Sequence, residues 1–363
     1  MAGRVAVVGA TGAVGEDLRR LLEARDFPCD GVVFVASERS AGRRLPFRGR
    51  EVTVRALTDR DVFDGVDLAL FSAGASTSRE HAPRAVAAGA MVVDNSSAWR
   101  MDPDVPLVVT EVNPHALARR PKGIVANPNC TTMVAMLPLK ALHDAFGLVG
   151  FTATSFQAAG GAGQQGIDEL EAQVEPLFAH RDLLRRDGAA AMKLVEQRVH
   201  ADVLAFNVVP LLGTEGDDGY TDEEMKLQNE SRKILELPDL QVAPTCVRVP
   251  VMVGHALQVR AEFEDPVTTA NAISSLEGFP GMVLDRAPTP LAWAGRGEVA
   301  VGRVRADLND PRALNFWVTG DNLLKGAALN TVQIAELLVG GGGGSPQLAV
   351  RTGRGDEPRL TEP

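Results

Sequence analysis

The chain opens with a strand, a glycine-rich turn and a helix, and this order leaves few folds open to it. An apolar β-branched run at residues 4–8 leads into GATGAVG (residues 9–15) and then into an amphipathic stretch at residues 16–24. Such a unit begins a doubly wound α/β sheet, and the backbone N–H groups of its turn can approach a pyrophosphate. The GxxGxxG spacing departs from GxGxxG, and glycines also serve packing alone. We predict a dinucleotide site at this turn.

Further apolar strands are predicted at residues 32–35, 67–71, 91–94 and 123–126, which extends the doubly wound pattern to about residue 132. Small and polar segments follow them: ASERSAG (36–42), SAGAS (72–76) and DNSSAWR (94–100). Open α/β sheets bind ligands at these carboxyl ends. Arg39 and Ser40 suit a ribose 2′-phosphate, which favours NADP over NAD, and Glu38 is expected to point away. Arg100 is a ligand candidate, although a lone arginine is more often on the surface.

Cys130 lies in NPNCTT (127–132), between the strand at 123–126 and a predicted helix that ends near Phe146. The unpaired N–H groups and the dipole at a helix start favour an anion, so we expect the thiol to lose its proton readily. A buried, inert cysteine is the alternative from position alone.

The second half of the chain mixes strands and helices. A strand at 151–157 precedes a glycine loop at 158–163, and a helix starts near residue 165. Residues 181–202 are charged and helical in pattern. Thr221 and Glu224 form a capping-box pattern for a long helix, in which Glu223 and Lys226 share a face. Strands are predicted at 246–251, 255–260 and 314–318, with a turn at 252–254, an apolar helix at 325–339, and a disordered tail beyond.

Composition excludes several classes of protein. The length of 363 residues suggests two or three domains, and a net charge of −10 argues against nucleic acid or an anionic membrane as partner. Three widely spaced cysteines and six histidines without paired spacing predict neither a disulfide framework nor a metal site. Without a signal peptide or an apolar run of about 18 residues, a cytoplasmic location is expected.

Taken together, the motifs resemble the aspartate-β-semialdehyde dehydrogenase family from about Val5 to Leu338. The motifs follow the family order: GATGAVG, ASERSAG, SAGAS, DNSSAWR, NPNCTT, SFQAAGGAG, ExxK, CVRVPVMVGH and DNLLKGAALNT. The resemblance implies an α/β fold with an N-terminal doubly wound (Rossmann-like) NADP-binding domain and an α+β catalytic and dimerisation domain. The expected boundaries are 1–132, completed by a helix at about 325–339, then 133–324, then a disordered tail at 340–363.

The resemblance also implies roles. Cys130 is expected to be the acyl-thioester nucleophile, His255 the general acid/base and Gln157 the group that orients substrate. The implied substrate-binding residues are Arg100 and Lys226 for phosphate, Arg248 for the substrate carboxylate, Glu223 for its amine, and Asn129. The implied NADP-binding residues are Gly9, Thr11, Gly12, Ala13, Val14, Ser37, Arg39, Ser40, Ser72, Gly74, Gly160, Gly161 and Asn322. At position 160 the family commonly has serine.

The implied reaction is NADPH-dependent reductive dephosphorylation of L-aspartyl 4-phosphate to L-aspartate 4-semialdehyde and phosphate. This step belongs to lysine (diaminopimelate), methionine and threonine biosynthesis, and the family usually forms homodimers. The alternatives are an N-acetyl-γ-glutamyl-phosphate reductase or glyceraldehyde-phosphate-type dehydrogenase, a non-catalytic NADP-binding relative, and a purely structural module. The NPNCTT, ExxK and RVPVxxGH motifs favour the aspartyl substrate, and the presence of both Cys130 and His255 argues against the non-catalytic relative.

Overall fold

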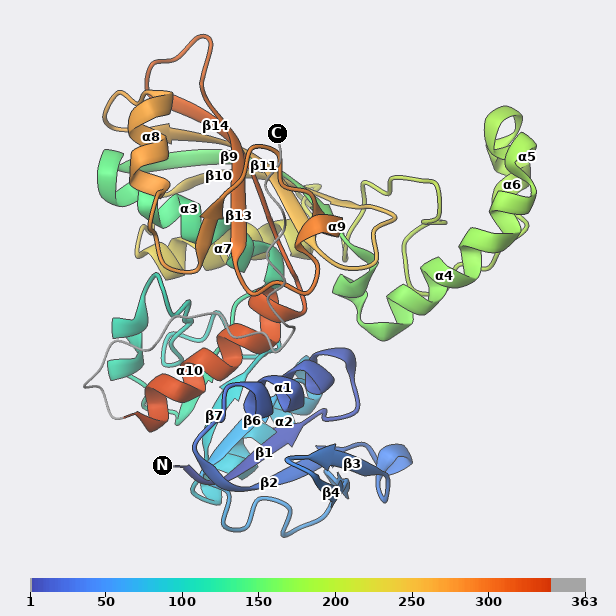
Figure 1. The fold of residues 1–363 in the computed structure, drawn as a ribbon, viewed down its shortest axis with the longest axis vertical. Coiled ribbons are helices and arrows are strands. Elements are labelled where there is room, and N and C mark those ends of the chain that lie inside the picture. The colour runs from blue at the N-terminus through green and yellow to red at the C-terminus, as the bar shows by residue number, and fades with distance from the viewer. Residues whose placement is uncertain (1, 341–363) are drawn as a thin grey trace.

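In the computed structural model, which describes residues 2–340, the N-terminal part of the chain forms a six-stranded sheet (Figure 1). The strand order is β5-β2-β1-β6-β7-β8, and all neighbouring strands run parallel. Strands that extend in both directions from β1 make this a doubly wound sheet, as predicted. Its strands are β1 (Ala2–Val8), β2 (Cys29–Ala36), β5 (Arg55–Ala56), β6 (Leu68–Phe71), β7 (Met91–Asp94) and β8 (Ile124–Ala126).

Helices α1 (Ala13–Ala24) and α2 (Ala75–Ala87) follow β1 and β6 and complete two of the strand-to-helix units. In α1, Leu18, Leu21 and Leu22 are buried, so the apolar stripe that predicted the helix also attaches it to the sheet. The sequence did not indicate the small antiparallel hairpin of β3 (Arg44–Phe47) and β4 (Arg50–Thr53), nor the short 3-10 helices η1 (Glu38–Ser40) and η2 (Pro114–Ala118).

The second sheet has six strands in the order β10-β9-β11-β14-β13-β12. It is mixed, because β9 pairs parallel with β10 and antiparallel with β11, while β13 pairs parallel with β12. Its strands are β9 (Leu148–Gln157), β10 (Gln241–Arg248), β11 (His255–Phe263), β12 (Met282–Leu284), β13 (Val299–Ala306) and β14 (Ala313–Gly320). β10 ends three residues earlier than predicted. The backbone of Val249 still donates to Gln157, but Pro250, which has no N–H to donate, follows at once.

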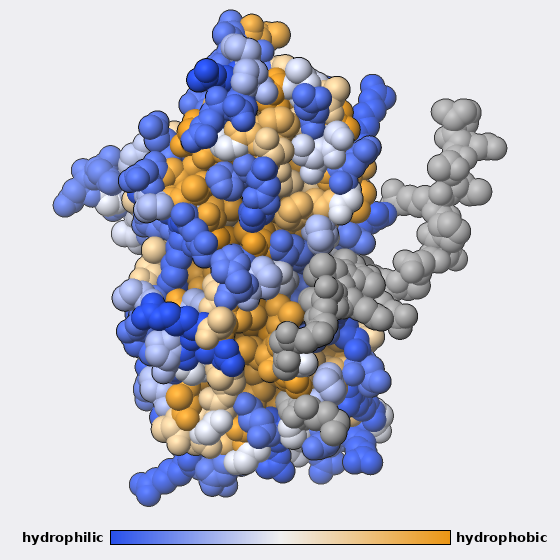
Figure 2. Space-filling model, turned by 90° about the vertical axis from the view of Figure 1, so that its left-hand side faces the viewer, coloured by the Kyte–Doolittle hydropathy of each residue, from blue (hydrophilic) through white to orange (hydrophobic). Residues whose placement is uncertain are grey.

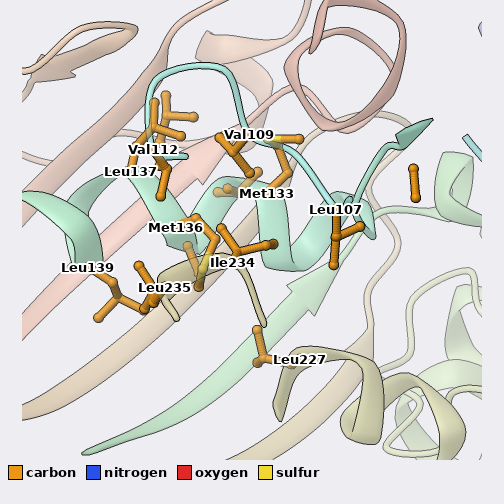
Figure 3. Close-up of a cluster of buried hydrophobic side chains, with 14 of the residues drawn as sticks. Leu107, Val109, Val112, Met133, Met136, Leu137, Leu139, Leu227, Ile234 and Leu235 are labelled. Atoms are coloured by element: carbon orange, nitrogen blue, oxygen red, sulfur yellow. The ribbon is translucent and has the colours of Figure 1, made fainter. Parts of the chain in front are cut away.

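One face of this sheet is covered by α3 (Cys130–Phe146), α7 (Asp222–Leu235) and α8 (Thr269–Leu276), while the short α9 (Pro290–Trp293) lies near β14. Figure 3 shows Met136 of α3 beside Ile234 and Leu235 of α7, and Met133 belongs to the same buried cluster. This apolar contact fixes α7 against the helix that begins at Cys130, which matters for the site.

Residues 164–192 form an arm that projects from the body in Figure 1. It contains α4 (Gln164–Ala179), α5 (Arg181–Arg186) and α6 (Gly188–Met192), and its own small core includes Leu170 and Leu177. The helical pattern predicted for 181–202 is therefore correct only as far as Met192. Residues 193–202 form turns, because no continuous apolar stripe passes through them.

The chain returns to the first sheet at its C-terminal end. A π-helical turn, η4 (Leu324–Ala328), leads into α10 (Leu329–Val339), and Val332 and Ala335 share a buried cluster with Val5 of β1. The domain boundaries at 132 and 324 stay predictions. The predicted disordered tail lies outside the described residues except for Gly340, which caps α10.

Figure 2 shows one face of the molecule, on which hydrophilic side chains surround apolar ones in both halves. Within residues 2–340, no helix combines the length and the hydropathy that a membrane crossing requires.

Candidate active site

Cys130 is the first residue of α3 and follows directly from the turn after β8. The side chain of Asn129 caps this helix, since its Oδ1 accepts hydrogen bonds from the backbone N–H groups of Thr131 (2.9 Å) and Thr132 (3.2 Å). An asparagine cap satisfies donors that the first helical turn leaves unpaired. The sequence therefore fixes locally where the helix begins and how the thiol is presented.

His255, the first residue of β11, lies with its Nε2 3.2 Å from the Sγ of Cys130. Its other ring nitrogen, Nδ1, accepts a hydrogen bond from the backbone N–H of Ala158 at 3.0 Å. Because that donor occupies the Nδ1 lone pair, the neutral ring carries its proton on Nε2 and directs it at the sulfur. The fold thus brings together two residues that are 125 positions apart in the chain.

The charge state of this pair differs from the expectation. Burial, helped by the charge of Glu223, raises the pKa of the Cys130 thiol to about 11, although Arg100 and Arg248 act in the opposite direction. Burial and the charge of Arg248 lower the pKa of His255 to about 3. The expectation that the helix start makes the thiol acidic was wrong for the resting site, because the long-range fold desolvates the sulfur. Both groups are neutral near pH 7.

Arg100 is buried, and three of its N–H groups are engaged. Its Nε donates to the Asn127 carbonyl (2.9 Å), its Nη2 to the Asn95 carbonyl (3.0 Å) and its Nη1 to Oε1 of Glu230 (3.1 Å). It also lines the cavity that contains Cys130. A guanidinium has five N–H donors, so a buried Arg100 held in this way can still present donors to an anion.

Glu223 and Lys226 lie on the first two turns of α7 and line the same cavity, which has a volume of about 530 Å³. Glu223 accepts from the Asn129 Nδ2 (2.9 Å) and from the Lys226 Nζ (3.1 Å), while Lys226 also donates to Asp222. The predicted shared face of this pair is confirmed by the contact. The predicted capping box of Thr221 and Glu224 is also present.

Arg248 and Gln157 end two neighbouring parallel strands and stand side by side in the register of β10 and β9. The Nη1 of Arg248 donates to the Ala158 carbonyl at 2.7 Å, in the segment whose N–H holds His255. Gln157 is buried and donates to the Ser155 hydroxyl at 3.2 Å. Its predicted role beside the thiol stays a prediction.

The residues predicted to hold a dinucleotide divide between two cavities at the carboxyl edge of the first sheet. One, of about 560 Å³, is lined by Gly9, Thr11, Gly12, Ser37, Arg39 and Ser72. The cavity around Cys130 is lined by Val14, Gly74, Gly160, Gly161 and Asn322. Ala13 begins α1, and the buried Ser40 accepts from the Thr11 hydroxyl at 3.4 Å. Glu38 does not point away as expected, because it lines the first cavity and accepts from Thr58 at 3.1 Å.

Glycine allows neighbouring atoms to approach the backbone closely at several of these positions. Gly9 has φ +89°, and a Cβ there would lie 2.1 Å from the Ser72 carbonyl oxygen. A Cβ at Gly160 would lie 2.9 Å from the Met252 carbonyl oxygen, which fits glycine where the family commonly has serine. A Cβ at Gly161 would lie 2.6 Å from the Arg248 Nη1. Close backbone approach of this kind is what a cradle for a cofactor beside the reacting atoms requires.

The sequence analysis missed Glu230, Lys233 and Gly326. Glu230 and Lys233 look like ordinary charges on a helix, and only their spacing from Glu223 and Lys226 could have indicated a common face. Gly326 lies in η4, where a Cβ would be 2.9 Å from the Cβ of Cys130.

Comparisons with known proteins identify the family of the chain. Residues 4–120 match a model described as semialdehyde dehydrogenase, NAD binding domain, and residues 139–325 match semialdehyde dehydrogenase, dimerisation domain. Aspartate-semialdehyde dehydrogenases from Corynebacterium glutamicum and Mycolicibacterium smegmatis are 52% and 50% identical over 92% of this chain, and the chain covers 99% and 98% of them.

Among solved structures, aspartate semialdehyde dehydrogenase II from Vibrio cholerae, complexed with ASA, superposes with a TM-score of 0.89 at 42% identity, covering 94% of this chain and 99% of that one. An enzyme from Candida albicans with NADP shares the fold, with a TM-score of 0.72 at 24% identity, covering 93% of this chain and 99% of that one. This chain belongs to the aspartate-semialdehyde dehydrogenase family of oxidoreductases.

Proposed function

We propose that this enzyme reduces L-aspartyl 4-phosphate with NADPH to L-aspartate 4-semialdehyde and phosphate, through a thioester on Cys130. The single observation that carries this proposal is the 3.2 Å contact between Cys130 Sγ and the buried His255 Nε2, beside a cavity that Cys130 lines together with Arg100, Glu223 and Lys226. A nucleophile beside a hydrogen-bond donor, with cations and an anion around them, matches what an acyl phosphate of an amino acid needs.

In the first step, the sulfur of Cys130 attacks the acyl carbon, a C–S bond forms and the bond between carbon and the phosphate oxygen breaks. The thiolate is the reactive form, and burial keeps the resting thiol protonated. The departing phosphate is a base and takes the thiol proton. The protons of this step therefore balance without a charged His255. Arg100 and Lys226 hold the phosphate during this transfer.

In the second step the thioester carbon is reduced, and a bound NADPH would supply the hydride. The oxygen becomes an oxyanion, and the Nε2–H of His255 donates to it. Collapse of the oxyanion restores the carbonyl, breaks the C–S bond and releases the semialdehyde, and the thiolate then takes a proton from solvent water. A neutral imidazole is enough to stabilise the oxyanion, because the oxyanion needs an N–H donor at the place where its charge develops. The Ala158 N–H on Nδ1 supports this role, since it disfavours the imidazolium.

The remaining polar residues would select the substrate. Arg248 suits the α-carboxylate, because a guanidinium binds carboxylates through two parallel hydrogen bonds. Glu223 suits the α-ammonium, and Gln157 orients the reacting group. Asn129 links Glu223 to the thiol turn. Arg39, Ser37 and Ser40 fit the 2′-phosphate of NADP, and the glycines of both cavities fit its pyrophosphate and nicotinamide ends.

We further propose that the enzyme is a cytoplasmic homodimer that acts in lysine, methionine and threonine biosynthesis. The match of residues 139–325 to a dimerisation-domain model supports pairing. So does the sheet face opposite α3, where Phe156 and Trp317 are half-exposed with ring centroids 5.3 Å apart. Within residues 2–340, the buried Nε1 of Trp317 has no hydrogen-bond acceptor.

The test is NADP reduction with aspartate semialdehyde, with and without phosphate, for the wild type and Cys130→Ser. Phosphate-dependent reduction that disappears in the variant supports the reaction, the substrate and the nucleophile together. A folded wild type that binds NADP but does not turn over would overturn the substrate assignment. A parallel assay with NAD tests the coenzyme preference.

A further inference from the structure

Four charged residues lie along one face of α7 at spacings of three, four and three positions: Glu223, Lys226, Glu230 and Lys233. This spacing keeps side chains in a single stripe on a helix. Beside this stripe, Leu227, Ile234 and Leu235 of α7 pack into the core (Figure 3). The first two charges of the stripe belong to the proposed substrate site, whereas the last two do not reach the cavity.

Glu230 connects two parts of that site. Its Oε1 accepts from the Arg100 Nη1 at 3.1 Å, and its Oε2 accepts from the backbone N–H of Asn129 at 2.6 Å. The side chain is 2% exposed, so solvent does not compete for either hydrogen bond. One buried carboxylate therefore holds both the cation assigned to phosphate and the residue that precedes Cys130.

Lys233 holds the backbone of the same loop. Its Nζ donates to the carbonyl oxygens of Arg100 (2.7 Å), Asp102 (2.8 Å) and Val105 (2.8 Å). Three carbonyls use all three donors of an ammonium group. α7 thus fixes the main chain of Arg100 through Lys233 and its guanidinium through Glu230.

We propose that Glu230 is a positioning residue that sets Arg100 for phosphate and the Asn129 peptide for Cys130, so that phosphate binding and placement of the thiol depend on one carboxylate. This inference rests on the proposed function, because it takes Arg100 as a phosphate ligand. A glutamine at 230 keeps the size but has one oxygen, so its NH2 group would face either the Arg100 guanidinium or the Asn129 N–H. One of the two hydrogen bonds is then lost.

The test is Glu230→Gln, assayed in the oxidative direction with phosphate, semialdehyde and NADP varied separately. We expect the KM for phosphate to rise about tenfold or more, while the KM values for semialdehyde and NADP stay within about threefold. Glu224→Gln is the matched control. It is the neighbouring buried carboxylate, but it caps α7 and accepts from the Cys246 N–H, so its phosphate KM should not change.

A second measurement does not depend on turnover. Inorganic phosphate should slow alkylation of Cys130 by iodoacetamide in the wild type, and the concentration for half-protection should rise about tenfold in Glu230→Gln. Wild-type turnover that fails while this shift is present would count against the proposed reaction but not against the role of Glu230.

Three results would overturn the inference. A phosphate KM that stays unchanged or falls in folded Glu230→Gln would mean that the carboxylate only neutralises Arg100. A loss of kcat with all KM values unchanged would mean that the carboxylate serves only the Asn129 peptide, so that phosphate binding and thiol placement do not depend on one group. If Glu230→Gln does not fold, Lys233→Gln replaces it, because it frees the loop carbonyls, and an unchanged phosphate KM there would contradict the inference.

Discussion

Cys130 and His255 form a neutral pair at rest, and this has a chemical consequence. A thiol with a pKa near 11 is almost wholly protonated at neutral pH, so we expect slow alkylation and oxidation of the free site. Reactivity then has to arise with the substrate, whose ammonium would neutralise Glu223, one of the two causes of the raised pKa. We therefore expect Cys130 to be activated only when substrate occupies the site.

The rate of Cys130 alkylation by iodoacetamide should therefore rise about tenfold per pH unit between about pH 7 and 9 in the free enzyme. The sign follows from the raised pKa, because the thiolate fraction grows with pH until the pH reaches that value. Mass spectrometry of the peptides would follow Cys130 and the half-exposed Cys29 separately. A rate that levels off below about pH 8 would mean that the helix start does acidify the thiol.

Gly161 lies close to two side chains of the site, Arg248 and His255. A Cβ there would lie 2.6 Å from the Arg248 Nη1 and 3.2 Å from the His255 Nε2. We expect Gly161→Ala to displace Arg248, which would raise the KM for semialdehyde and lower kcat about tenfold or more, as misplaced catalytic groups do. Gly188→Ala, in the arm where nothing lies within 4 Å, is the control. Equal kinetics for both variants would refute this account.

At the scale of elements, the turn η4 and helix α10 connect the nucleophile to the first sheet. Lys325 is fully buried, and its Nζ donates to both carboxylate oxygens of Glu111 at 2.7 Å and to Gln333 at 2.8 Å. The next residue, Gly326, abuts Cys130. A buried ion pair between these segments therefore holds the turn that the nucleophile packs against.

Lys325→Met should lower the free energy of unfolding by about 3–5 kcal/mol, because it leaves Glu111 as a buried charge without its counter-charge. Replacing both partners by methionine should recover much of this loss. Lys140→Met, which breaks the i,i+4 surface pair with Asp144, should cost less than about 0.5 kcal/mol. Urea unfolding measures all three, and a similar cost for Lys325→Met and Lys140→Met would contradict the assigned role.

Sequence reasoning succeeded where local chemistry decides the structure. The strands and glycine turns of the doubly wound sheet, the capping box at Thr221 and the helix start at Cys130 follow from propensity and capping alone. The resemblance to aspartate-β-semialdehyde dehydrogenases was also confirmed by the comparisons. Short strands such as β12 and the hairpin of β3 and β4 carry too few residues to give a periodic signal.

The rest depends on contacts between distant parts of the chain. Glu230 and Lys233 resemble solvent-facing charges until α7 packs against α3 and directs them at the Arg100 loop. Likewise, the raised pKa of Cys130 comes first from burial, which no local pattern reports. The direction of Glu38 depended on Thr58, twenty residues further on.

At the scale of the whole molecule, the second sheet has one face covered by α3, α7 and α8 and one face open in the monomer. Alternation along β9 places Phe151 and Ala153 in the core and Thr152 and Thr154 on the open face. An open face that carries a half-exposed tryptophan is typical of an interface, because aromatic residues are enriched there.

We therefore expect light scattering at micromolar concentration to give twice the 38.5 kDa of the chain for the wild type. Trp317→Arg would place a charge at the centre of the open face, where it would be desolvated without a partner, and should shift the mass toward the monomer. Ala88→Arg adds the same charge at the exposed end of α2 on the first domain and should leave the mass unchanged. A monomeric wild type would contradict pairing altogether. A dimeric Trp317→Arg would mean that the interface lies elsewhere, and the arm of residues 164–192 would be the next surface to test with an arginine substitution.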